Sequence, residues 1–336
     1  MTIIYAILML CFLIFIHEFG HFVAAKACGV KVNEFALGMG PCIVQKQYGE
    51  TMYSLRAIPI GGYCAMEGED EDSADDRAFC NKSAGQKAII LVAGSLMNLI
   101  AAIILMTVMV FYIGFPSTTI SGVEKDSPAA VAGIEVGDQI VQVNGEKIND
   151  WYELSDIIKG TEEGEKLKVL VDRNGTEVMC TPEVYKSGGK MIIGVTSAYE
   201  RDPAKALVYG PKATWDMAKS MYDVLRQLIT GDVAAKELSG VVGIVYMVDH
   251  SISQGFITFI YFTAMISLNL AIMNMLPFPA LDGGRLVFVV IRKITGKAIT
   301  DKMEGVFHMV GMVLLLMLMV YVTWQDILRF ILPVFK

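Results

Sequence analysis

The sequence has few charged residues for its length. Charged side chains make up 19% of the 336 residues, whereas hydrophobic ones make up 54%. This composition is too apolar for an ordinary soluble protein and indicates a membrane protein with several spans, so the lipid bilayer is an expected partner. The net charge of −7 and the lack of clustered Lys and Arg argue against nucleic acid as a partner.

The six cysteines lack the spacing of a disulfide framework or of a zinc-binding cluster. Five of them lie in or shortly after the first apolar run, and Cys180 stands alone in the polar middle of the chain. We therefore interpret all six as structural or incidental. The N-terminus has neither the basic region nor the small-residue cleavage site of a signal peptide, so we expect its apolar run to remain in the protein.

Four apolar runs are long enough to cross a bilayer, which takes about 20 helical residues. They predict transmembrane helices at about 3–25, 88–115, 256–276 and 305–328. The predicted fold class is a polytopic α-helical membrane protein with four such helices, a membrane-associated β-hairpin and an inserted strand-rich α+β domain. The predicted divisions are a first membrane part at 1–117, the strand-rich domain at 118–200, an amphipathic and partial membrane segment at 201–250, and a second membrane part at 251–336.

The β-structure is predicted from local patterns. The runs Cys42–Tyr48 and Met52–Pro59, within a β-loop at 38–66, flank a Gly49-Glu50 turn and predict a hairpin. Such a hairpin offers an unpaired edge to which an extended substrate could add as a strand, although a purely structural hairpin fits the pattern equally well. In the polar middle, alternating runs with Asn-Gly turns at 144–145 and 174–175 predict further hairpins.

The first apolar run contains His17, Glu18 and His21, an H-E-x-x-H motif. Residues four apart share one face of a helix, so both imidazoles can bind one metal ion. Neutral imidazoles suit zinc, and the adjacent carboxylate can take a proton from a zinc-bound water. Ionisable groups inside a span are costly and usually functional. The pattern therefore predicts a zinc site with Glu18 as the general base.

Asp282 is the predicted third ligand. Pro277 and Pro279 end the third apolar run, and Asp282 follows in a Leu-Asp-Gly-Gly turn. Irregular backbone at membrane depth is tolerated where it lines a cavity, which a hydrolytic site also needs.

Asn98 is polar within the second span, where it could pack or lie near the metal, and we favour packing. His250 and His308 are interpreted as nonligands, and the acidic stretch 67–76 as a solvated loop.

Charge predicts the orientation in the membrane. The segment 285–304 is a short loop rich in Arg and Lys, which should be cytoplasmic. The first span then runs inward, so the N-terminus and the strand-rich domain are extracytoplasmic. His17 and Asp282 both fall toward the cytoplasmic side, at similar depth. The expected location is the cell membrane, with the site near its inner face.

Two sets of motifs resemble known families. Residues 123–148, with the order S-P-A-x-x-A-G-I-x-x-G-D-x-I-x-x-V-N-G, resemble a PDZ domain of the bacterial type, which binds peptide ends by strand addition. HEFGH in a first span and N-x-x-P-x-P-x-L-D-G-G after a late span together resemble the site-2 protease family, in its RseP-like branch. Two departures are Val241, where many members have proline, and Arg285, where many have histidine; they leave the branch and the substrate open.

The resemblance implies an intramembrane zinc endopeptidase of regulated intramembrane proteolysis. Its substrates would be single-span membrane proteins, shortened first by another protease, such as anti-sigma factors or signal-peptide remnants. By position, His17, His21 and Asp282 match the zinc ligands and Glu18 matches the general base. The positions linked to substrate binding are Asn269, Asn274, Pro277 and Pro279.

Two other classes of function compete with a protease. A PDZ peptide-binding membrane scaffold could use zinc only as a structural ion. A metal transporter would also carry His and Asp in its spans, but it should show paired inverted halves, and this chain shows no repeat.

Overall fold

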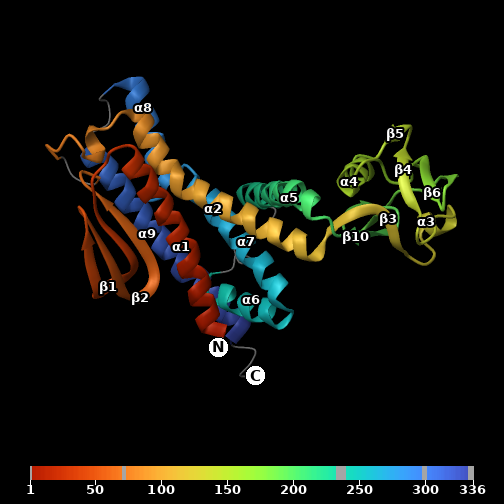
Figure 1. The fold of residues 1–336 in the computed structure, drawn as a ribbon, viewed down its shortest axis with the longest axis horizontal. Helices are drawn as coiled ribbons and strands as arrows, with labels where there is room; N and C mark the ends of the chain where they lie inside the picture. Colours follow the sequence, from red (N-terminus) through yellow and green to blue (C-terminus); the bar gives the residue numbers. More distant parts are fainter. Residues whose placement is uncertain (1, 70–72, 232–239, 297–300, 332–336) are drawn as a thin grey trace. The chain divides into compact units, whose positions relative to one another are not determined.

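Figure 1 shows the computed structural model, which describes residues 2–69, 73–231, 240–296 and 301–331. The chain forms two compact units, Met1–Thr107 with Gly210–Lys336, and Val108–Tyr209. The first is mainly helical and the second is mainly strands. The α-helices of the described residues are α1 (Thr2–Ala27), α2 (Ala84–Ile113), α3 (Pro128–Val131), α4 (Trp151–Lys159), α5 (Pro203–Thr230), α6 (Val241–Ser253), α7 (Phe256–Asn274), α8 (Asp282–Thr295) and α9 (Asp301–Asp326).

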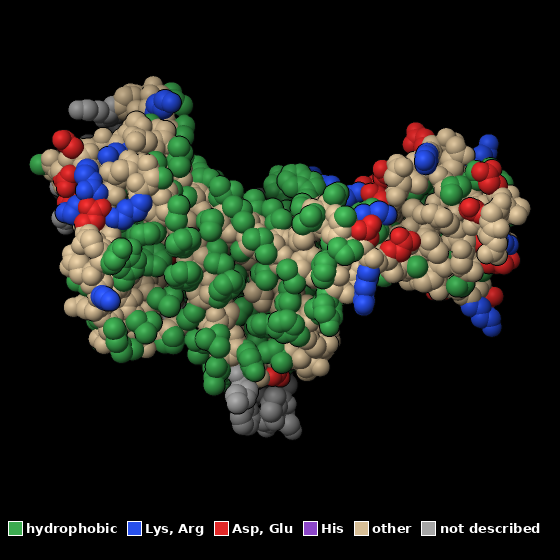
Figure 2. Space-filling model, in the orientation of Figure 1, with side chains coloured by type: hydrophobic (Ala, Val, Ile, Leu, Met, Phe, Trp, Pro, Cys, Tyr) green, Lys and Arg blue, Asp and Glu red, His purple; other side chains and the backbone are tan. Residues whose placement is uncertain are grey.

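Four helices of the described residues are long and apolar enough to cross a membrane. They are Thr2–Ala27, Ala84–Ile113, Phe256–Asn274 and Met303–Arg329. The four predicted spans are therefore confirmed as helices of the required length and composition. Hydrophobic side chains cover most of the face of the helical unit that is visible in Figure 2. A surface of this kind is suited to contact with the hydrocarbon core of a lipid bilayer.

One predicted segment differs from expectation. The segment 285–304 is largely helix α8 and not a loop, with 297–300 outside the described residues. Its apolar residues Leu286 and Val289 pack on the core beside α1, and this amphipathic pattern explains the helix. Within the segment predicted at 201–250 as amphipathic and partly in the membrane, the structure has α5 and then α6 from Val241 on, which packs against α1 and α7; residues 232–239 lie outside the described part.

Strands β1 (Val32–Tyr48) and β2 (Thr51–Met66) form the predicted hairpin, and they are longer than predicted. Tyr48 pairs with Thr51 across the Gly49-Glu50 turn. Both strands double back: residues 34–37 pair with 62–65 and also with 52–55. Positive φ angles at Gly38 and Gly40 allow β1 to bend there. The bend leaves 62–66 as one edge of the sheet.

The sheet follows α1 along much of its length. At one end Glu50 pairs with Lys26 at 2.7 Å, and further along Cys11 Sγ donates to Pro59 O at 2.7 Å. Lys26 and Cys11 are separated on the helix by about 22 Å, at about 1.5 Å per residue. The shared core contains Ala25, Phe35 and Cys64, among others. The hairpin is thus packed beside α1 from its charged end to its apolar middle.

The second unit contains a six-stranded sheet in the order β10-β3-β4-β6-β7, with β5 paired to β4. Asn144 and Gly145 both have positive φ, as do Asn174 and Gly175, so the two predicted turns are confirmed. The predicted limits 118–200 lie within this unit and stay a prediction. The strands are β3 (Phe115–Val123), β4 (Gln139–Val143), β5 (Glu146–Lys147), β6 (Val169–Arg173), β7 (Thr176–Cys180), β8 (Tyr185–Ser187), β9 (Lys190–Ile192) and β10 (Val195–Glu200).

Asp138 is a buried acid in this second unit. Its Oδ1 accepts from Arg173 Nε at 2.7 Å, and its Oδ2 accepts from Arg173 Nη2 at 2.8 Å and from the Glu135 amide at 2.9 Å. The Arg173 guanidinium lowers the pKa of the Asp138 carboxyl below its ordinary value. The pair therefore stabilises the unit at pH values above the unfolded pKa of about 3.9. That stabilisation is lost as the pH falls through the lower folded pKa.

We expect Asp138→Asn to destabilise the unit by about 1–3 kcal/mol at pH 7, because a charge-assisted pair is lost. The difference from the unchanged protein should shrink as the solution is acidified. The rate at which a protease cuts within 108–209 in the full-length protein measures the effect. Glu135→Gln is the matched control, because Glu135 also pairs with Arg173 but its side chain is 65% exposed. This substitution should change the stability by less than about 1 kcal/mol. An equal effect of both variants would contradict the prediction.

Candidate metal centre

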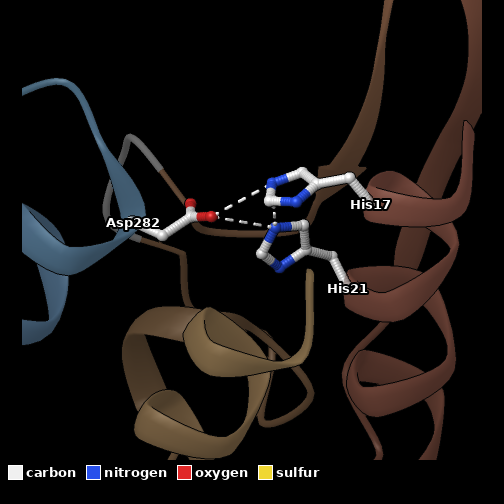
Figure 3. A group of neighbouring side chains, drawn as sticks. All are labelled: His17, His21 and Asp282. Carbon is white, nitrogen blue, oxygen red and sulfur yellow. Dashed lines mark hydrogen bonds and ion pairs between the residues drawn. The ribbon is translucent and has the colours of Figure 1, made fainter. Parts of the chain in front are cut away.

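Two histidines of α1 and the first residue of α8 converge on one point. His17 Nε2 lies 3.2 Å from His21 Nε2 and 3.2 Å from Asp282 Oδ2, and His21 Nε2 lies 3.3 Å from the same oxygen. Figure 3 shows the three side chains pointing toward one another, the two imidazoles from α1 and the carboxylate from α8. The i, i+4 spacing on α1 aligns the imidazoles, and the turn after α7 brings in the carboxylate.

The donor set fits zinc. A tetrahedral ion with ligands at about 2.0–2.1 Å requires ligand atoms about 3.3 Å apart, close to the separations found here. His21 Nδ1 lies 2.8 Å from the Ile90 carbonyl oxygen, which can only accept, so this nitrogen carries the proton and Nε2 keeps its lone pair. The three atoms therefore present two neutral nitrogens and one carboxylate oxygen to a single ion.

Asn98 of α2 fixes the other imidazole. Its side chain is fully buried, and its amide nitrogen lies 3.5 Å from His17 Nδ1. Its Oδ1 is buried and has no hydrogen-bond partner. Since the two ends of an amide are interchangeable by rotation, Oδ1 can take the position beside Nδ1 and accept a proton from that ring nitrogen. That orientation also leaves His17 Nε2 free to bind a metal.

Glu18 and two of the three convergent residues, His17 and Asp282, border the same cavity, of about 260 Å³. Glu18 lies one position after His17 and is partly buried. Asn274, at the end of α7, lies with its amide nitrogen 3.4 Å from His17 Nε2. A carboxylate, an amide and a metal-binding cluster thus face one space. The residues that line it are Ile14, His17, Glu18, Asn98, Leu270, Asn274, Ala280, Leu281 and Asp282.

The other residues predicted to bind substrate lie elsewhere. Asn269 and Pro277 are exposed and do not line the cavity. Pro279 lies against α9, where a methyl group built on Gly311 would overlap it. Asn98, for which we favoured packing, does pack but is also part of the cavity wall. Its position four residues after Gly94, on one helix face, is the signal that could have assigned it to the site.

The remaining polar candidates have other partners. His250 is exposed and bonds Gln254, as expected of a surface residue. Within the acidic stretch, Glu69 pairs with Arg285, the residue that departs from the family pattern, and its Oε2 accepts from the Met66 amide at 3.4 Å. Arg285 therefore ties the first turn of α8 to the end of β2. Residues 70–72 lie outside the described part.

Comparison with known proteins places these features in a family context. Residues 5–318 match peptidase family M50. A Clostridium acetobutylicum protein whose name contains the words zinc metalloprotease is 39% identical, over 97% of both chains. Zinc metalloprotease RasP of Oceanobacillus iheyensis is 32% identical over 98% of this chain and 99% of its own, and regulator of sigma-W protease RasP of Bacillus subtilis is 30% identical over 98% of each.

Among solved structures, the PDZ domain of an SdrC-like protein from Listeria monocytogenes is 20% identical to part of the chain. The similarity covers 26% of this chain and 92% of that one, with a TM-score of 0.23.

Proposed function

The chain belongs to peptidase family M50, and from this premise we propose that it cleaves single-span membrane proteins within the bilayer, at the cavity bordered by His17, Glu18 and Asp282. The protein is a multi-pass membrane zinc metalloprotease. The observation that carries the proposal is the convergence of three ligand atoms beside Glu18, between helices long enough to span a membrane. His17, His21 and Asp282 would hold the zinc ion.

Bound zinc supplies a Lewis acid that polarises a peptide carbonyl and acidifies water. The residues of the chain do the rest. Glu18 takes the proton from the attacking water and passes it to the leaving amine, a role that its place in the cavity wall allows. The amide of Asn274, which also lines the cavity, can donate a hydrogen bond to the substrate backbone. The buried Asn98 keeps His17 oriented.

Residues 62–66 offer the substrate a strand to pair with. This segment is an edge of the sheet, paired on one side with 32–37. A methyl group built on Gly62 would lie 3.5 Å from Glu18 Cγ and 2.9 Å from the Ala36 carbonyl oxygen, so the edge passes directly beside the general base. An extended substrate that adds to this edge would bring its backbone to Glu18 without any demand on its sequence.

We infer that the hairpin dips into the membrane and that the site lies toward the cytoplasm. The sheet follows α1 from Lys26 to Cys11, so it accompanies the apolar part of the span. Basic residues gather at the same ends of the spans, with Lys26 ending α1, Lys87 starting α2, and Arg292 and Lys293 in α8. The positive-inside rule puts these ends in the cytoplasm and the second unit outside.

The proposed substrates are single-span proteins, including anti-sigma factors and signal-peptide remnants, shortened beforehand by another protease. Support comes from the Bacillus subtilis relative, whose name describes a regulator of sigma-W. A cavity of this size accepts one extended chain and not a folded domain. Prior removal of a substrate's outer domain therefore fits the dimensions of the site.

Reconstituted liposomes that contain the full-length protein and a single-span substrate test the proposal. Cleavage should occur within the span, stop when a chelator removes zinc, and return when zinc is restored.

Strand addition at residues 62–66 has its own test in the same liposomes. N-methylation of the substrate amides next to the scissile bond should slow cleavage, because it removes the hydrogen-bond donors that pair with this edge. An impermeant thiol reagent should label cysteines placed at Ser121 and Thr295 from opposite sides. Zinc-loaded protein that cuts no single-span substrate would refute the proposal.

A further inference from the structure

The turn that carries Asp282 has a strained backbone. Ala280, two residues before Asp282, has φ of +74°. The other described non-glycine residues with positive φ are Asp126, Asn144 and Asn174, whose side chains tolerate this region. Alanine has no such side chain, so contacts from elsewhere must stabilise the turn.

The stabilising contact comes from α9, a helix with none of the three convergent residues. His308 Nδ1 accepts a hydrogen bond from the Ala280 amide at 2.8 Å. Gly311 lies one turn further along the same face, where a methyl group would be 2.7 Å from the Pro279 carbonyl carbon. The backbone of the turn therefore rests directly on α9, with the imidazole bonded to its strained residue.

Side chains of α8 and α9 surround the His308 ring. Its Nε2 lies 3.7 Å from Glu304 Oε1, and the other oxygen of Glu304 lies 2.6 Å from Arg292 Nη2 of α8. The ring of Phe288, also of α8, packs on the imidazole with centroids 5.6 Å apart. Because Nδ1 accepts from Ala280, the proton of the neutral ring is on Nε2, toward Glu304.

We propose that His308 is a positioning residue for the metal centre: its bond to the Ala280 amide fixes the left-handed turn and so directs Asp282 at His17 and His21. The inference rests on the proposed metal site. It assigns to the last spanning helix a role in shaping the site, through a histidine that is not a ligand.

Substitutions at residue 308 separate positioning from simple packing. The Oδ1 of His308→Asn falls where Nδ1 lies in histidine, whereas the acceptor of His308→Gln reaches further out. We expect the asparagine variant to keep zinc affinity within about 3-fold, and the glutamine and leucine variants to lose about 10- to 100-fold, the usual cost of losing a partner outside the ligand set. Met309→Leu, at a neighbouring position that is 61% exposed, is the control and should change nothing.

Zinc affinity is measured on full-length purified protein by competition with a chromophoric chelator, and the absorption spectrum of the cobalt-loaded protein reports the ligand geometry. Loss of stability alone would leave that spectrum unchanged. Ala280→Gly supplies an independent arm, because glycine adopts positive φ without steric cost. In that background the loss caused by His308→Gln should fall to about 3-fold.

Equal affinities for the asparagine and glutamine variants, or the same loss with and without Ala280→Gly, would overturn the inference. If the leucine variant does not fold, the two amide variants and the glycine background still decide it. No substrate is involved, so a protein that binds zinc but cleaves nothing would refute the proposed function while leaving this result interpretable.

Discussion

Glu18→Gln is expected to abolish proteolysis while zinc stays at about one ion per chain. Glutamine has nearly the size of glutamate but cannot accept a proton, so the water that attacks the peptide bond loses its base. Loss of a general base costs about 10²- to 10⁴-fold in rate. Glu18 borders the cavity without being one of the three convergent residues, so the metal should remain.

Asp282→Ala should behave differently, with loss of both zinc and activity. Two histidines alone leave an incomplete site, and removal of a ligand should cost more than the 10- to 100-fold typical of outer partners. The measurement is the metal content and cleavage rate of purified protein for both variants. Glu146→Gln, the same change at an exposed position of β5, is the control. Cleavage at the normal rate by Glu18→Gln would exclude it as the base, and full zinc in Asp282→Ala would exclude it as a ligand.

The parts of the fold with a strong local pattern could be predicted from the sequence. Long apolar runs predicted the four helices, and the two Asn-Gly pairs predicted turns that have the required positive φ at both positions. Spacing alone placed His17 and His21 on one helix face. Asp282, more than 260 positions further along, was matched to them by the family motif and by the expected depth, because no local pattern links two distant segments.

The remaining features depend on contacts between elements. The doubled-back sheet requires residues 34–37 to pair with two partners at once, and the local pattern of the runs predicted only a simple hairpin. The Arg and Lys residues of α8 indicated a loop, whereas the apolar residues on one face of this segment favour a helix. The positive φ of Ala280 is invisible in a sequence, since alanine ordinarily avoids that region. Each of these features depends on a neighbour that is distant in the chain.

Gly94 shows how closely two of these helices approach at the metal centre. A methyl group built at Gly94 of α2 would overlap His21 Nε2 and lie 2.7 Å from His17 Cε1. Across the same contact, a methyl group on Gly20 of α1 would lie 2.8 Å from the Ala93 carbonyl carbon. The backbone of α2 therefore forms the wall against which both imidazoles rest. Any side chain at residue 94 must push the rings or the helices apart.

We expect Gly94→Ala to lower zinc affinity by more than about 100-fold and to abolish cleavage, because both imidazoles must move. The effect on folding should be smaller, since overpacking costs about 1–3 kcal/mol of stability. Gly85→Ala is the matched control: it is the same change in the same helix, with no atom within 4 Å of the added methyl group. The control should bind zinc normally and be slightly stabilised, since alanine favours helix over glycine by up to about 1 kcal/mol. Chelator competition and thermal unfolding of the two variants measure both effects. Normal zinc binding by Gly94→Ala would mean that α2 can move away without disturbing the histidines, and that the wall it forms is not part of the metal centre.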